Sequence, residues 1–165
     1  MTRELALLPE NIKDTIRGHQ ASAPVRLSAL ASALGVGLKA ATLPAGISGE
    51  IRPDPSSPGD VVIRVNRHDS DKRQRFTVAH EIAHFLLHRD HIGNGIKDDA
   101  LYRSSLSDRR EAEANRLAAD LLMPEHLIAD WLERARLLRV DDVASYLAKQ
   151  FEVSEASMKI RLGLV

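Results

Sequence analysis

The sequence predicts an α+β protein in which a small antiparallel sheet of three short strands is followed by helices. Three short apolar segments bounded by turn residues, at 38–43, 48–52 and 61–66, have the length and composition of strands. A longer apolar run from Phe76 to Leu87 has helical length. Helical patterns then continue to the C-terminus, so the strands and the long helices occupy different parts of the chain.

The segment ahead of the sheet is predicted to contain two helices. Residues 2–19 are expected to form one helix in spite of Pro9, because apolar residues recur on one side of it, at Leu5, Leu8, Ile12 and Ile16. Residues 20–24 form a linker. A short helix follows at 26–34 and ends at Gly35.

Helices also dominate the C-terminal half. A second long helix is expected over 109–123, ending before Pro124. Residues 89–108 show no periodicity and are expected to form a long loop, of the kind that often carries function. Three further helices are predicted after Pro124: 125–138, then 141–151 with Asp141 as N-cap, then 154–163 with Ser154 as N-cap.

We expect one domain. Residues 1–24 make up the N-terminal helix and linker, and residues 25–165 form the domain itself, with a helical tail over about 125–165. A chain of 165 residues can bury a substantial hydrophobic core.

Composition narrows the classes of function. Lys plus Arg and Asp plus Glu both number 23, so the net charge is zero, and we expect no direct binding to DNA. The chain has no cysteine and therefore no disulfide. No apolar run approaches the roughly 18 residues of a membrane-spanning helix, and the first residues lead into no signal-like core. The expected location is the cytoplasm, without a membrane partner.

The most specific pattern is His-Glu-x-x-His at residues 80–84. Residues four apart on a helix lie one turn above each other, so His80 and His84 present their imidazoles from one face. Two imidazoles so placed can bind one zinc ion. Glu81 lies about 100° round the helix, too far to ligate, but it can reach a water molecule at the same metal, where a general base is needed.

A hydrolytic zinc site takes a third protein ligand and leaves one position open. Since cysteine is absent, this ligand must be His, Asp or Glu. The helix over 109–123 has small residues along one side, including Ala114 and Ala118, and can approach another helix closely. Glu111 projects from the edge of that face. Glu113 points about 200° away on the same helix, so the two cannot both ligate, and Glu113 is the alternative to Glu111.

Two longer motifs carry a resemblance to a known family. The first runs from Arg75 to His88 and contains the His-Glu-x-x-His pattern; the second combines Glu111-Ala112-Glu113-Ala114-Asn115 with Leu121-Leu122-Met123-Pro124. With these motifs, the chain resembles the ImmA/IrrE metallo-endopeptidases, also known by the IrrE N-terminal-like domain, over roughly residues 25–165. The resemblance implies a zincin-like fold, with an HExxH helix, a second ligand-bearing helix and C-terminal helices.

The resemblance also implies a function, that of a zinc-dependent endopeptidase with one Zn²⁺ per chain. In that family the third ligand is the glutamate that opens the second motif, here Glu111, beside His80 and His84. The implied substrate is a helix-turn-helix repressor or antitoxin of the Xre type, cleaved or inactivated in bacterial stress or mobile-element regulation. A substrate strand could pair with the sheet edge near 48–51. The alternative is a zinc-stabilised toxin or regulator that binds a repressor partner without proteolysis.

Two more side chains near the motifs are candidates for a role. In zinc peptidases of this geometry a tyrosine or histidine hydrogen-bonds the oxyanion of the tetrahedral intermediate. Tyr102 is the candidate catalytic residue for this role, because it lies in the loop ahead of the Glu111 helix, and Arg103 is the alternative. His88 lies one turn beyond His84 and is expected to pack in the core or to hydrogen-bond a ligand.

Overall fold

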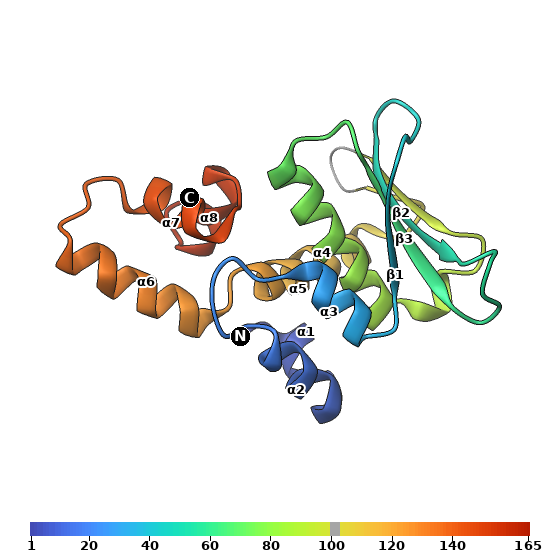
Figure 1. Cartoon of the computed structure of the whole chain (residues 1–165), viewed down its shortest axis with the longest axis horizontal. Coiled ribbons are helices and arrows are strands. Elements are labelled where there is room, and N and C mark those ends of the chain that lie inside the picture. The colour runs from blue at the N-terminus through green and yellow to red at the C-terminus, as the bar shows by residue number, and fades with distance from the viewer. Residues whose placement is uncertain (100–102) are drawn as a thin grey trace.

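A four-stranded mixed sheet stands at one side of the molecule (Figure 1). The computed structural model describes residues 1–99 and 103–165. The strands are β1 (Gly37–Ala41), β2 (Ile47–Pro53), β3 (Val61–Asn66) and β4 (Ile96–Asp99), in the spatial order β1-β3-β2-β4. β1 runs parallel to β3, whereas β2 is antiparallel to both of its neighbours.

The predicted three-stranded antiparallel sheet is therefore wrong in two respects. The first strand pairs in parallel with the third, so the sheet is mixed and not antiparallel throughout. The fourth strand, β4, comes from the segment 89–108, which also contains a short 3-10 helix, η1 (Arg89–His91). β4 has only four residues, and the position that faces inward beside Ile96 is Asp98, so its pattern does not mark a strand.

Two long helices pack against each other and, through the first of them, against the sheet. These are α4 (Asp71–Leu87), which contacts β2 and β3, and α5 (Asp108–Leu122). Each begins at a serine whose side chain accepts a hydrogen bond from the helix backbone, Ser70 for α4 and Ser107 for α5. The predicted second helix before Pro124 is confirmed.

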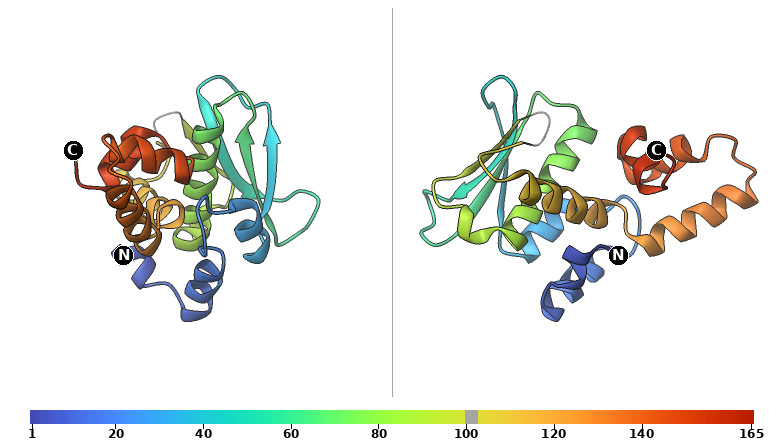
Figure 2. Two further views of the ribbon diagram at one scale, coloured as in Figure 1. Left: turned by 60° about the vertical axis from the view of Figure 1, so that its left-hand side comes forward. Right: turned by 180° about the vertical axis from the view of Figure 1, so that it is seen from behind.

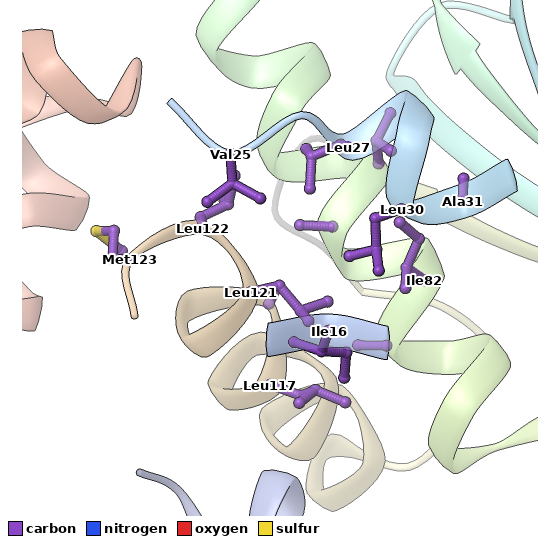
Figure 3. Close-up of a cluster of buried hydrophobic side chains, with 14 of the residues drawn as sticks. Ile16, Val25, Leu27, Leu30, Ala31, Ile82, Leu117, Leu121, Leu122 and Met123 are labelled. Atoms are coloured by element: carbon purple, nitrogen blue, oxygen red, sulfur yellow. The ribbon is translucent and has the colours of Figure 1, made fainter. Parts of the chain in front are cut away.

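The main core lies around these two helices. Figure 3 shows buried side chains gathering there from four helices: Ile16, Leu30, Ile82 and Leu121 are each at most 1% exposed. This core holds α4 and α5 at a fixed separation, and both predicted site motifs lie on these helices.

The N-terminal segment forms three helices rather than two. They are α1 (Arg3–Ala6), α2 (Glu10–Gly18) and α3 (Leu27–Ala33). The single helix predicted over 2–19 is divided at Pro9, which lies just ahead of α2 and cannot donate a backbone hydrogen bond within a helix. α3 ends as predicted, since Gly35 adopts a φ of 77° that favours glycine.

The C-terminal helices are α6 (Glu125–Leu137), α7 (Val143–Phe151) and α8 (Glu155–Arg161). α6 extends away from the sheet, and α7 and α8 fold back towards α4 (Figures 1 and 2). Ser154 caps α8 as predicted, but the cap of α7 is Asp142 rather than Asp141, because its side chain is the one that accepts from the Ser145 amide. Among the helices of the described segments, none has both the length and the apolar character needed to cross a bilayer.

Candidate metal centre

The two histidines of the His-Glu-x-x-His run point from α4 towards α5. Both side chains are fully buried, and their Nε2 atoms lie 3.0 Å apart. The four-residue spacing on a regular helix stacks the rings one turn apart, as the sequence predicts. Small residues between and beside them, Ala79 and Ala83, allow α5 to approach this part of α4.

Glu111 reaches the histidines from the first turn of α5. Its Oε2 lies 3.2 Å from His80 Nε2 and 3.5 Å from His84 Nε2. Its other oxygen accepts a hydrogen bond of 2.5 Å from the hydroxyl of Ser104. The predicted small-residue face of α5 makes this approach possible, because Ala114 is fully buried against the neighbouring helix.

Glu113, the alternative to Glu111, lies outside this group. Its Oε2 accepts a hydrogen bond of 3.0 Å from His88 Nε2, and its Oε1 accepts one of 3.0 Å from Arg109. His88 in turn lies beside His84, with their Nδ1 atoms 3.0 Å apart. Glu113 is therefore connected to the histidine cluster through His88 and not directly.

These outer contacts fix the ring protons. His88 Nε2 must donate, because the Glu113 carboxylate only accepts; the neutral His88 ring then accepts at Nδ1 the proton of His84 Nδ1. His80 Nδ1 similarly donates to the amide oxygen of Asn115 at 2.9 Å. When these two helix histidines are neutral, the remaining proton lies on Nδ1 and the Nε2 lone pair is directed at the cluster, as metal ligation requires.

Asp98 is a member of the cluster that the sequence reasoning missed. This β4 residue is fully buried, with Oδ1 3.5 Å from His80 Nε2 and Oδ2 3.7 Å from His84 Nε2. Four side chains, His80, His84, Asp98 and Glu111, bring ligand atoms within 4.8 Å of one another. The only signal in the sequence is an acidic residue two positions after an apolar one, which occurs in many loops.

The histidines and carboxylates of the cluster shift one another's pKa values. Burial alone would lower the pKa of His80, but the carboxylates of Asp98 and Glu111 outweigh burial and raise it to about 9. The same carboxylates raise the pKa of His84. Burial opposes ionisation of Glu111, yet the two histidines lower its pKa to about 2, and they also lower the pKa of Asp98. The group thus holds two carboxylates in their ionised form.

Glu81 lies beside this group but has a different environment. It is fully buried, and neither of its carboxylate oxygens has a hydrogen-bond partner among the described residues. Burial raises the pKa of Glu81 well above its usual range, and the charge of Asp98 raises it further. The side chain packs where β2 has Gly49, since a Cβ at that position would lie 3.2 Å from Glu81 Oε1 and would overlap the methyl group of Thr77.

The donor set fits a divalent cation such as zinc. Ligand atoms of a tetrahedral zinc site lie about 3.4 Å apart when the bonds are about 2.0–2.2 Å long. The separations among His80 Nε2, His84 Nε2 and Glu111 Oε2 are 3.0, 3.2 and 3.5 Å. The ionised carboxylate of Asp98, whose oxygens have no hydrogen-bond partner among the described residues, adds negative charge that a cation would compensate.

Comparisons with known proteins agree with this geometry. A model of the IrrE N-terminal-like domain matches residues 28–163. The chain belongs to this family. The resemblance predicted from the two motifs is thereby confirmed, and the buried histidine and acid cluster could hold the metal ion expected in an IrrE-like metalloprotease domain.

Two relatives show how much of a longer protein this domain represents. The radiation response metalloprotease IrrE of Deinococcus radiodurans is 35% identical over 155 residues, which are 93% of this chain and 45% of that protein. The solved structure of a Mycobacterium tuberculosis transcriptional regulator superposes with a TM-score of 0.56 at 19% identity, covering 96% of this chain and 48% of that one. The latter likeness concerns the fold alone. The chain spans about half the length of each.

The two residues predicted to assist at the oxyanion have different outcomes. Tyr102 lies outside the described residues. Arg103, its alternative, is at the surface, where its guanidinium pairs with Asp99 at 3.2 Å and its side chain is 66% exposed. In this IrrE-like domain, Arg103 therefore has no contact with the histidine cluster in the form described.

The predicted docking of a substrate strand near 48–51 is wrong for this form of the sheet. β2, which contains these residues, is flanked by β3 on one side and β4 on the other. A groove of about 670 Å³ lies elsewhere, between α4, α5 and α8, and is lined by none of the four cluster residues. Its lining includes Phe76 and Asn115, both of which contact the His80 ring.

Proposed function

We propose that this protein is a zinc-dependent endopeptidase with one Zn²⁺ per chain, held by His80, His84 and Glu111. The observation that carries the proposal is the buried triangle of two Nε2 atoms and one carboxylate oxygen. A second carboxylate, on the residue that follows His80, has no hydrogen-bond partner among the described residues. Membership of the IrrE N-terminal-like family supports it.

The residues of the chain divide the catalytic work. Bound zinc would polarise the scissile carbonyl and make a water molecule acidic enough to lose a proton near neutral pH. Glu81 accepts that proton and then delivers it to the leaving nitrogen. Its raised pKa suits this double role, because a carboxylate with a raised pKa takes up a proton more readily than an ordinary glutamate does. Asn115 and His88 hold the histidine rings in the required tautomers.

The substrate in this proposal is a helix-turn-helix repressor or antitoxin of the Xre type, cleaved or inactivated in bacterial stress or mobile-element regulation in the cytoplasm. The radiation response named for the Deinococcus radiodurans relative supports a role in stress.

A second candidate function is a zinc-stabilised regulator or toxin that binds a repressor partner without proteolysis. One observation favours it: with Asp98, the group has four side chains that could act as metal ligands. Four protein ligands are typical of structural zinc sites. In that case Glu81 has no chemical task.

The variant Glu81→Gln separates the two functions, because it is nearly isosteric and removes only the base. We expect zinc content to stay unchanged while cleavage of a proteome-derived peptide library and of a neighbouring-gene repressor falls by about 10²–10⁴-fold. Glu133→Gln, an exposed substitution on α6, is the matched control and should cleave as the parent does. Undiminished cleavage by Glu81→Gln would contradict the role of Glu81 as the general base. Lost cleavage with unchanged repressor inactivation in cells would favour the second function.

A further inference from the structure

Asp98 is buried where a strand normally places an apolar side chain. Along β4, Ile96 and Asp98 face inwards while Lys97 is exposed, so the carboxylate occupies a core position. Neither of its oxygens meets hydrogen-bond geometry with a described residue, and each lies near a histidine nitrogen, Oδ1 at 3.5 Å from His80 Nε2 and Oδ2 at 3.7 Å from His84 Nε2. A buried ionised carboxylate in such a position is costly unless a cation compensates its charge.

Asp98 lies at nearly the same distances from the two histidine nitrogens as Glu111 does. Its oxygens lie 3.5 Å from His80 Nε2 and 3.7 Å from His84 Nε2, and Glu111 Oε2 lies 3.2 and 3.5 Å from the same two atoms. All of these separations are close to the roughly 3.4 Å edge of a tetrahedral zinc site. One Asp98 oxygen faces each histidine nitrogen at close to this spacing, so the carboxylate is within reach of the fourth position, which a hydrolytic site keeps for water.

We infer that Asp98 is a fourth protein ligand that closes the metal site in the resting form, and that it must withdraw before water and substrate can enter. The inference rests on the metal site of the proposed function, but not on proteolysis. In this inference β4 blocks the metal site through Asp98. Detachment of β4 by a substrate or partner would open a ligand position at the metal.

The way β4 is attached is consistent with release. It has four residues and, among the described strands, pairs only with β2 at the end of the sheet. Its register with β2 shifts beside Asp98: Asp98 pairs with Gly49, whereas Asp99 pairs with Ile47, so Ser48 is passed over. Detaching this short edge strand breaks few backbone hydrogen bonds and leaves α4 and α5 in place.

Cobalt(II) binding tests the assignment without any substrate, because the visible spectrum of the ion reports its ligands. Azide is the probe of an open position. We expect the cobalt spectrum of the parent protein to be unaffected by azide, and that of Asp98→Ala to change with it. We also expect Asp98→Ala to bind the metal at least about tenfold more weakly in chelator competition, since even an outer partner of a ligand contributes that much.

The control is Asp99→Ala, which removes the same charge one residue along, where the side chain pairs with Arg103 at the surface. It should behave as the parent protein does. Asp98→Asn keeps the shape of the side chain and is measured in the same way, so that a folding defect of the alanine variant cannot obscure the result.

Three results would overturn the inference. These are a parent spectrum that responds to azide as strongly as Asp98→Ala, an unchanged metal affinity in both Asp98 variants, or no cobalt binding by the parent at all. Only the last would also remove the metal site of the proposed function. If azide leaves the cobalt spectrum of the parent unchanged and the protein cleaves nothing, the proposed proteolysis is contradicted, while the assignment of Asp98 as a ligand stands.

Discussion

The two helix histidines differ in what holds their rings. Asn115 accepts directly from His80 Nδ1, whereas His84 Nδ1 depends on a chain of two residues, His88 and then Glu113. The chain ends in an anion, which makes the His84 ring a better electron donor at Nε2. Glu113, which competes with Glu111 in the sequence, thus has a role of its own.

We predict that His88→Phe binds zinc about 10–100-fold more weakly than the parent, because His84 loses the partner that fixes its tautomer while the ring volume is kept. Competition with a fluorescent chelator measures the affinity. Glu113→Gln is the control: its amide oxygen can still accept from His88 Nε2, so its effect should be smaller. Equal affinity of His88→Phe and the parent would show that the chain from His84 to Glu113 is only packing.

The charges of the cluster predict how the metal-free protein responds to pH. The pKa of His80 is raised to about 9 from an unfolded value near 6.5, so the protonated ring stabilises the fold fully below about pH 6.5. That contribution is lost as the pH rises through about 9. We expect the melting temperature of chelator-treated protein to fall between these values, as measured by calorimetry. Zinc-loaded protein should lack this fall, since ligating histidines are already neutral.

At the scale of elements, the close contact of α4 and α5 brings ligands from two helices together. Ala79 and Ala83 of α4 and Ala114 and Ala118 of α5 are all fully buried. Any larger side chain in this contact must push the helices apart, and Glu111 would move away from the histidines.

We predict that Ala118→Leu lowers the free energy of unfolding by about 1–3 kcal/mol, because it overpacks this contact, and that it also weakens zinc retention. Urea denaturation and metal analysis measure the two effects. Ala112→Leu adds the same atoms at a half-buried position of α5 and should change both quantities little. If the two variants were equally stable and equally loaded with zinc, the helix contact would not control the site.

The long helices could be predicted from the sequence, whereas the shortest strand could not. α4 and α5 follow from apolar residues at helical spacing and from their caps, so the three site residues on them could be named in advance. β4 could not, because a four-residue strand with an inward aspartate has no hydrophobic pattern. Asp98 was missed for the same reason. The parallel pairing of β1 with β3 depends on how the strands are connected. The alternation of apolar and polar residues along each strand does not encode this.

For the whole molecule, several contacts tie the terminal helices to the site-bearing pair. Thr2 donates to the carboxylate of Asp120 on α5 through its amide and its hydroxyl, at 2.8 and 2.7 Å. Arg161 of α8 donates to the other oxygen of Asp120 at 2.8 Å. Arg75 of α4 donates to backbone carbonyls of Val25 and Phe151. The N- and C-terminal helices therefore share partners on α4 and α5 that the local patterns of the sequence do not reveal.

Zinc content per chain is the most direct measurement of the site. After dialysis against a weak chelator, we predict one zinc per chain for the parent by mass spectrometry of the metal, and markedly less for Glu111→Ala. Glu113→Ala should retain clearly more zinc than Glu111→Ala, because Glu113 contacts the cluster only through His88. A Glu111→Ala protein that keeps its zinc while Glu113→Ala loses it would contradict a metal centre built from His80, His84 and Glu111.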